Sequence, residues 1–218
     1  MSSSSTPVTV HLVPGSPYGR VVMIALEEKS APYETVAMSF GDHKAPEYLA
    51  KQPFGRIPAI THGDFKLYET QAILRYVDRA FDGPSLQPKD LRALARMDQL
   101  MNIIDWYLFP QVTVTIPFER LVAPRLGRAT DEAKVAAAVP AARHCIEVIE
   151  GLIAGPPFLT GDTISLADIM MVTHIEYLSM TPEGGEILAG RPLLSWLERM
   201  QARPSLRATG QPVGREAA

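Results

Sequence analysis

A stretch rich in proline, glycine and polar residues, FDGPSLQPKD at residues 81–90, divides the sequence into halves of different character. Before it, short β-branched runs alternate with helical patterns, whereas after it the strand pattern largely disappears and long helical repeats follow. Stretches of this composition are typical of domain boundaries. We therefore expect one domain at residues 1–81, a linker at residues 82–90, and a second domain at residues 91–218.

The first half predicts a small α/β domain. Its expected strands are VTVHLV at 8–13, YETVAM at 33–38, IPAIT at 57–61 and FKLYE at 65–69. Its expected helices begin at Pro17 and near Thr70, where apolar residues recur at helical spacing. A helix between the first two strands implies that these strands lie parallel, because a parallel pair needs a crossover connection.

The second half predicts helices. Apolar residues recur at helical spacing in three segments, which are residues 91–109, 130–155 and 192–204. Pro140 lies inside the second of these and predicts a kink or a break. In GDTISLADIMM, Ser165 stands three residues before Asp168, as in a capping box, and Ile164 and Ile169 flank the motif as a hydrophobic staple. We interpret this motif as structural, and we expect loss of the Asp168 carboxylate to cost about 1 kcal/mol of cap stability.

Composition narrows the classes of partner. The net charge of −3 and the lack of a basic block argue against a nucleic-acid partner, which requires a cationic surface. The longest apolar runs are far shorter than the roughly 20 residues that span a bilayer, and the N-terminus lacks the pattern of a signal peptide. The single cysteine, Cys145, lies in a helical pattern, where we expect a buried structural thiol. We therefore predict a cytoplasmic protein with no metal site, no membrane partner and no nucleic-acid partner.

Residues Ser16-Pro17-Tyr18-Gly19 lie where the first expected strand ends and the first expected helix begins. Redox proteins of the thioredoxin type carry a Cys-x-x-Cys pair at such a junction, and both cysteine positions hold other residues here. Two interpretations remain open for Ser16. Either it caps the helix while Pro17 takes the first helical position, or its hydroxyl is a catalytic group that replaces a thiol.

Four segments in the same order along the chain resemble the cytosolic glutathione transferase family. SPYGRVVMIALEE resembles the first helix of the serine-type classes, and GDHKAPEYLAKQPFGRIPAI resembles the phi-class pattern G-x-H-K-x-P-E-x-L-x-x-N-P-F-G-x-x-P. LYETQAILRYV matches the element that opens the third helix, and FLTGDTISLADI matches the cap and staple of the helical domain. The chain is therefore similar to serine-type, phi-like or bacterial members of the family. The resemblance implies a thioredoxin-like α/β N-terminal domain followed by an all-α C-terminal domain.

The resemblance assigns glutathione-binding roles to residues of the first domain. Pro58 matches the family's cis-proline, and that geometry exposes the backbone N–H and C=O of Ile57 to the cysteinyl segment of glutathione. Glu69 and Thr70 match the pair that holds the γ-glutamyl end, where the start of a helix favours a carboxylate. From the residues alone, Thr70 is equally suited to be only a helix cap.

His43 and Lys44 match the phi-class pair that meets the glycine carboxylate of glutathione. Two cationic contacts and one anionic contact, from Glu69, complement the two carboxylates and the ammonium group of this peptide. Arg56 stands where the family often has Gln, so its role as a ligand is the weakest of these assignments. A lysine in a polar loop is ordinarily only solvated, and the flanking match is what points Lys44 to the ligand.

The family's chemistry uses the thiolate of glutathione. Ser16 is expected to donate a hydrogen bond to this sulfur at the positive end of a helix dipole, which favours the anion. Tyr18 offers a second hydroxyl, so the sequence leaves open which of the two meets the thiol. We expect the bare surface of Gly19 to let the ligand or Tyr18 settle closely. In the second domain, MNIIDWYLFPQ suggests Met101 and Tyr107 for the pocket of the second substrate.

These observations predict a homodimeric glutathione transferase that conjugates glutathione, its co-substrate, to small apolar electrophiles. The family resemblance alone implies the dimer. Two alternatives remain. One is glutathione-dependent isomerisation, dehalogenation or peroxide reduction at the same thiolate site. The other is a non-catalytic binding or scaffold protein with the glutathione transferase fold.

Overall fold

The computed structural model describes residues 6–153, 155 and 157–210. These residues form two compact units, one made of the chain up to Leu86 together with Pro204–Gly210, and one made of Gln87–Arg203. The sequence places the boundary in the same region, within residues 82–90, but it assigns residues 204–210 to the second domain. The structural division differs from the expected one at this C-terminal segment.

The first unit is built on a four-stranded sheet in the order β2-β1-β3-β4. The strands are β1 (Val8–Leu12), β2 (Tyr33–Ala37), β3 (Ala59–His62) and β4 (Phe65–Tyr68). β1 pairs with β2 in parallel and with β3 antiparallel, and β3 pairs antiparallel with β4. This thioredoxin-like arrangement confirms the predicted α/β class and the parallel first pair.

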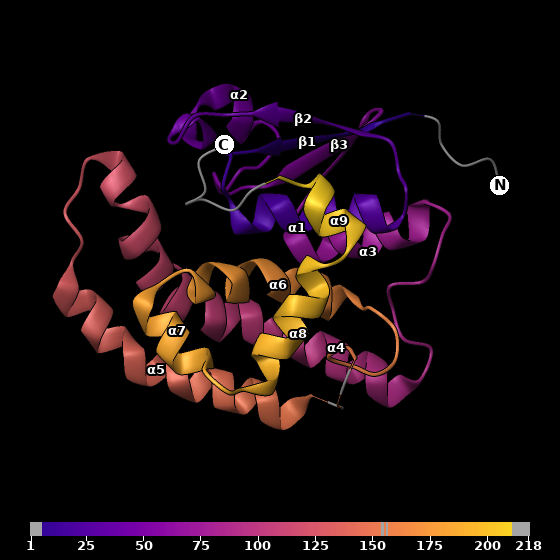
Figure 1. The fold of residues 1–218 in the computed structure, drawn as a ribbon. Helices are drawn as coiled ribbons and strands as arrows, with labels where there is room; N and C mark the ends of the chain where they lie inside the picture. The colour runs from indigo at the N-terminus through magenta and orange to yellow at the C-terminus, as the bar shows by residue number, and fades with distance from the viewer. Residues whose placement is uncertain (1–5, 154, 156, 211–218) are drawn as a thin grey trace. The chain divides into compact units, whose positions relative to one another are not determined.

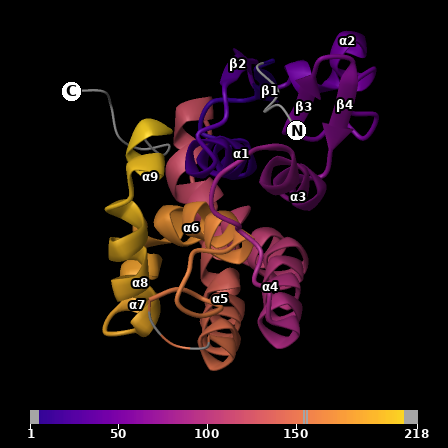
Figure 2. The ribbon, with the colours of Figure 1, turned by 90° about the vertical axis from the view of Figure 1, so that its right-hand side faces the viewer.

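Two helices cover one face of this sheet, as Figure 1 and Figure 2 show. α1 (Pro17–Glu28) follows β1, and α3 (Thr70–Ala80) follows β4. The buried apolar residues of β1, α1 and α3 include Val8, Val10, Leu12, Val21, Val22, Leu26, Ile73, Leu74 and Val77. Val10 pairs directly with the buried Ile60 of β3, so their side chains lie on the same face. Removal of this apolar face from water is the main force that holds the unit together.

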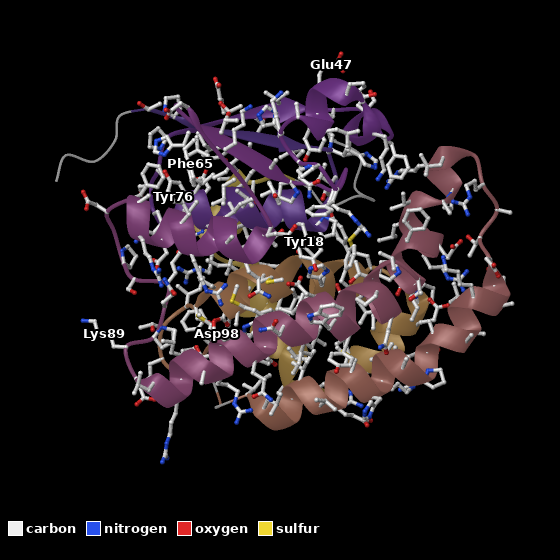
Figure 3. The ribbon with its side chains drawn as sticks, turned by 180° about the vertical axis from the view of Figure 1, so that it is seen from behind. Tyr18, Glu47, Phe65, Tyr76, Lys89 and Asp98 are labelled. Atoms are coloured by element: carbon white, nitrogen blue, oxygen red, sulfur yellow. The ribbon has the colours of Figure 1, made fainter. Side chains whose placement is uncertain are left out.

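The opposite side of the sheet is covered by the segment between β2 and β3 (Figure 1), which contains η1 (Asp42–Lys44) and α2 (Pro46–Leu49). Tyr48 and Gln52 of this segment are buried, whereas Glu47 is exposed and points away from the sheet (Figure 3). The sequence indicates only a polar stretch here, because its two helical turns are too short to show a period.

The C-terminal helix α9 (Pro204–Ala208) packs against α1 and so belongs to the first unit. The buried Arg20 of α1 donates from Nε to Thr209 Oγ1 at 3.3 Å and from Nη2 to the Leu206 carbonyl at 3.2 Å. These bonds join residues 186 to 189 positions apart in the chain. For that reason no local sequence pattern predicts these bonds. The sequence therefore shows no sign that residues 204–210 pack with the first unit.

The second unit is helical in the part that the structure describes, apart from one isolated bridge between Phe158 and Gly161. Its elements are α4 (Leu91–Ile103), η2 (Ile104–Thr113), η3 (Phe118–Val122), η4 (Pro124–Leu126), α5 (Glu132–Leu152), α6 (Leu166–Ser179), α7 (Pro182–Leu188) and α8 (Pro192–Gln201). α6 lies between α4 and α8 (Figure 2), and every residue from Leu166 to Leu178 is buried. This helix is the core of the second unit.

Prolines act differently in two helices of this unit. The expected helix at residues 91–109 is α-helical only to Ile103 and continues as the π-helical η2, which contains Pro110. A proline inside a helix lacks an N–H and clashes with the preceding turn, which accounts for the wider winding. By contrast, α5 runs through Pro140 without the break that the sequence allowed. Its flanking residues Ala138 and Ala142 are buried, and this packing offsets the missing hydrogen bond.

Two local predictions for the second unit are confirmed. The capping box of Ser165 and Asp168 is formed at the start of α6. Cys145 is buried in α5, and burial raises the pKa of its thiol to about 11, as expected for a structural thiol. Among the described residues, no helix is long and apolar enough to cross a membrane.

Candidate functional site

The site begins at Ser16, the N-cap of α1. Its backbone is extended (φ −67°, ψ 125°), and its Oγ accepts a hydrogen bond from the Gly19 N–H at 3.2 Å, while Pro17 takes the first helical position. A serine hydroxyl has two acceptor lone pairs and one donor hydrogen. Among the described residues none accepts that hydrogen from Ser16, so the cap leaves the donor available. Capping and donation to a ligand are therefore compatible in one side chain.

The structure gives Gly19 a packing role. A Cβ built on Gly19 would lie 2.9 Å from Leu12 Cβ, closer than side chains pack, so the glycine lets α1 approach the end of β1. Gly19 is buried, and a close approach of the ligand or of Tyr18 to it stays a prediction. Tyr18 itself is half-buried at the second position of α1 (Figure 3).

The chain before β3 carries the predicted cis bond. The Ile57–Pro58 peptide is cis, as the sequence resemblance implies. Pro58 is buried and Ile57 is half-buried immediately before β3 begins at Ala59. The cis bond is thereby confirmed, and the pairing of the Ile57 backbone with glutathione stays a prediction.

α3 begins at an unusual backbone position. Glu69 is its N-cap with φ 69° and ψ 113°, a conformation that few residues other than glycine adopt. Its side chain makes no capping hydrogen bond, and the first turn of α3 holds no acidic residue. Thr70 is the first helical residue rather than the cap. The N–H groups of this first turn have no partner within the helix, so the start of α3 favours an anionic group.

Lys44 lies across Gly55. Its Nζ donates to the Gly55 carbonyl at 2.9 Å, and a Cβ built on Gly55 would lie 2.8 Å from that nitrogen. Gly55 also has φ +58°, a conformation that favours glycine. An ammonium group has three donors, and at least one remains for a carboxylate next to the Ile57 segment.

The imidazole of His43 has an altered pKa. Burial, together with Lys44 and Arg56 nearby, lowers the pKa of this group. Its Nδ1 is buried without a hydrogen-bond partner among the described residues. That His43 and Lys44 meet the glycine carboxylate stays a prediction. The Arg56 side chain is exposed. The backbone of Arg56 is hydrogen-bonded by the buried side chains of Tyr48 and Gln52. The sequence analysis does not predict a role for these two residues.

The sequence of the chain matches known proteins over most of its length. The glutathione S-transferase N-terminal domain matches residues 10–85, and the glutathione S-transferase C-terminal domain matches residues 132–199. Glutathione S-transferase 4 of Zea mays is 34% identical over 203 residues, which is 91% of this chain and 91% of that protein. The chain belongs to the cytosolic glutathione S-transferase family. Plant phi-class proteins are among its relatives.

Solved structures of glutathione S-transferases agree along most of the chain. The maize glutathione S-transferase I in complex with an atrazine glutathione conjugate has a TM-score of 0.81 and 30% identity, over 93% of this chain and 96% of that one. A Sulfitobacter glutathione transferase homologue with bound glutathione has a TM-score of 0.77 and 27% identity, again over 93% and 96%. The fold predicted from the sequence is thereby confirmed.

The structure does not bring the two second-substrate candidates together. Met101 is 0% exposed and belongs to the core of the helical unit. Tyr107 is 54% exposed on η2, next to the exposed Trp106. Of the two, only Tyr107 offers its side chain to a ligand from outside. Met101 shares the buried helical face with Met97, Ile104 and Leu108, whereas Tyr107 lies off that face.

Within residues 6–153, 155 and 157–210, no group of three or more His, Cys, Asp or Glu side chains is placed to hold a metal ion. The groups around Ser16, Ile57, Glu69 and Lys44 are instead hydroxyl, backbone and charged groups, which suit a small peptide with carboxylate and ammonium ends.

Proposed function

We propose that this protein conjugates glutathione to small apolar electrophiles and that Ser16 stabilises the reacting thiolate. The observation that carries this proposal is the Ser16 hydroxyl. It caps α1 through an oxygen lone pair, and its hydrogen remains available for a sulfur atom at the N-terminus of the helix. The first turn of α1 holds no acidic residue that would repel such an anion.

Two effects then favour the thiolate over the thiol. The hydroxyl donates a hydrogen bond to the charged sulfur, and the helix dipole places a partial positive charge beside it. The thiol proton leaves to solvent, and the sulfur lone pair forms a bond to the electrophilic carbon. The leaving group departs with the electron pair of the broken bond, or the adduct takes up a proton from water. Ser16 is a hydrogen-bond donor here and not a base, because its own pKa is far too high.

Glutathione is proposed to lie along three further elements. The backbone N–H and C=O of Ile57 pair with the cysteinyl segment, and Lys44 meets the glycine carboxylate. The start of α3 receives the γ-glutamyl carboxylate, while the Glu69 side chain takes the ammonium group. His43, whose pKa is lowered by burial and by Lys44 and Arg56, contributes a hydrogen bond to the same region, and Arg56 adds a peripheral positive charge.

The second substrate is proposed to be an apolar electrophile that contacts Tyr107. Two relatives support the substrate class, since one was solved with an atrazine glutathione conjugate and another with glutathione. We also propose a cytoplasmic homodimer, as the family resemblance implies. Light scattering coupled to size-exclusion chromatography tests the dimer. The measured mass should be twice that of one chain.

Retention on immobilised glutathione and conjugation of a chromogenic electrophile test the proposal, each measured against pH. For Ser16→Ala we expect retained binding, an apparent thiol pKa raised by about one to two units, and conjugation at pH 7 slower by about tenfold to a hundredfold. Tyr18→Phe is the matched control and should change neither value by more than about twofold.

Other outcomes separate the alternatives. If Ser16→Ala conjugates like the parent, or if Tyr18→Phe carries the loss, the role of Ser16 is wrong. A parent protein that binds glutathione but fails to conjugate points to isomerisation, dehalogenation or peroxide reduction at the same thiolate. A parent that neither binds nor turns over supports a scaffold.

A further inference from the structure

Three side chains spaced four residues apart hold two consecutive peptide units of the backbone. Lys44 Nζ donates to the Gly55 carbonyl at 2.9 Å, and Gln52 Oε1 accepts from the Arg56 N–H at 3.0 Å. Tyr48 OH donates to the Arg56 carbonyl at 2.6 Å. All three come from the segment 44–52, and all three bind backbone in the turn that leads to Ile57.

Two of these side chains are inaccessible to solvent. Tyr48 is 4% exposed and Gln52 is 1% exposed, and the hydrogen bonds that they make to the Arg56 backbone are partly buried. Burial raises the pKa of Tyr48 to about 12, which keeps its hydroxyl protonated and able to donate at any physiological pH. Buried hydrogen bonds of this kind restrict the groups they join to a narrow range of orientations.

The geometry of the peptide unit extends this restriction to the ligand-binding backbone. The Gly55 carbonyl and the Arg56 N–H belong to one peptide plane, held at both ends by Lys44 and Gln52. The Arg56 carbonyl and the Ile57 N–H belong to the next plane, held by Tyr48. In a trans peptide the C=O and the N–H point in opposite directions, so fixing the carbonyl of Arg56 fixes the direction of the Ile57 N–H.

We propose that Tyr48 and Gln52 are positioning residues for glutathione, because they orient the Ile57 backbone toward its cysteinyl segment. This inference rests on the proposed function. Neither side chain touches the sulfur or the second substrate in this scheme. Their loss should therefore weaken the use of glutathione without changing the ionisation of its thiol or the affinity for the electrophile.

Tyr48→Phe tests the proposal, because it removes one hydroxyl and keeps the ring. We expect the KM for glutathione to rise about fivefold, the range expected for one hydrogen bond. The KM for the electrophile and the pH profile of conjugation should stay within about twofold of the parent. This split distinguishes Tyr48 from Ser16, whose loss moves the pH profile.

Tyr33→Phe is a matched control. Tyr33 is half-buried in the same unit, burial and the neighbouring Glu27 raise its pKa to about 12, and its hydroxyl donates to Glu27 Oε1 at 2.8 Å. Its partner is a side chain of α1 rather than the backbone beside Ile57. The control should therefore leave the KM for glutathione unchanged.

Gln52→Met gives a second measurement that needs no ligand. It removes the acceptor of the Arg56 N–H at similar side-chain length, so hydrogen exchange of that amide should be about tenfold faster in the free protein. The KM for glutathione should rise as in Tyr48→Phe. This variant also serves if Tyr48→Phe does not fold.

The outcomes are distinguishable. A folded Tyr48→Phe or Gln52→Met with faster amide exchange and an unchanged KM for glutathione overturns the proposal alone. An unchanged exchange rate for the Arg56 amide in Gln52→Met overturns it as well. A parent protein that does not retain glutathione overturns the proposed function and this proposal with it, whatever the exchange shows.

Discussion

Two helices of this protein begin at a serine cap, and the caps differ in what completes them. At α1 the Ser16 hydroxyl accepts one bond from Gly19, and the first turn contains no acidic residue. At α6 the buried Ser165 donates its hydroxyl to Asp168 Oδ2 at 2.7 Å, and the Ser165 N–H donates to the same oxygen at 2.9 Å. The second cap contains its own anion and the first does not.

The Asp168 carboxylate is bound from both sides. Its Oδ1 accepts from the Leu159 N–H at 2.9 Å and from Trp196 Nε1 at 2.9 Å, in addition to the two bonds from Ser165. The same start signal therefore serves two purposes. A cap closed by an internal carboxylate fixes the core, whereas a cap without one is suited to an external anion such as a thiolate.

Asp168→Ala should have the largest effect on stability. The substitution leaves four donors without their acceptor in a buried site, and we expect the free energy of unfolding to fall by about 4 kcal/mol. Urea unfolding at pH 7 measures this. Asp131→Ala is the control, because the exposed Asp131 caps α5 through one bond from the Lys134 N–H and should cost about 1 kcal/mol. Equal losses in the two variants would contradict the account of α6.

The first unit contains a buried ion pair, between Lys29 and Asp78, that lies outside the proposed glutathione site. Lys29 Nζ lies 3.2 Å from Asp78 Oδ1 and also donates to the Pro84 carbonyl, while the Leu86 N–H donates to Asp78. Asp78→Ala should lower the free energy of unfolding by about 3 kcal/mol, because it leaves the Lys29 ammonium buried and unpaired. The double variant Lys29→Met with Asp78→Leu should recover part of that loss. A double variant less stable than the single one would contradict the proposed cause.

The centre of the second unit should be sensitive to acid. His174 is buried in α6, its Nδ1 lies 3.0 Å from Thr113 Oγ1, and burial lowers its pKa from 6.5 to about 3. Between these values the unfolded chain binds a proton that the folded chain does not, so stability falls as pH falls. Protonation of His174 alone should lower the free energy of unfolding by about 2 kcal/mol between pH 7 and pH 5. His174→Gln should lack that component, as urea unfolding at both pH values will test.

Ser16→Asp should have the smallest effect on stability and a clear effect on chemistry. Aspartate caps a helix as well as serine does, so we expect the free energy of unfolding to change by less than about 0.5 kcal/mol. The new carboxylate places a negative charge where the thiolate is proposed to form, and conjugation should be slower than in Ser16→Ala. A thiol pKa equal to that of the parent, read from the pH dependence of conjugation, would contradict the role assigned to the α1 cap.

The elements of the fold were largely predictable because their signals are local. Alternation predicted the strands of the sheet, and helical spacing with caps predicted the starts of α1, α3 and α6. The cis bond before Pro58 came from the family resemblance, since neither spacing nor composition distinguishes a cis from a trans proline. The sequence shows only the capping-box partners of Asp168, and the hydrogen bonds that it accepts from Leu159 and Trp196 come from other parts of the fold.

The candidate site was less predictable, since its properties depend on neighbours that the fold brings together. The lowered pKa of His43 follows from burial and from Lys44 and Arg56 beside it. The different exposures of Met101 and Tyr107 follow from which helical face packs against the neighbouring helices of the second unit. Hydrogen bonds to the Arg56 backbone depend on how the segment 44–52 folds over the sheet, which no motif indicates.

The sequence by itself determined the α/β and helical halves, the serine at the start of the first helix and the family. Each of these features depends on residues within a few positions of one another, or on several motifs that follow one another in the family's order. The tertiary structure decided which cap is closed by an internal carboxylate, where the C-terminal helix returns, and which side chains hold the backbone before Ile57. Those features join residues from separate elements, and packing of the buried faces alone sets the distances between them.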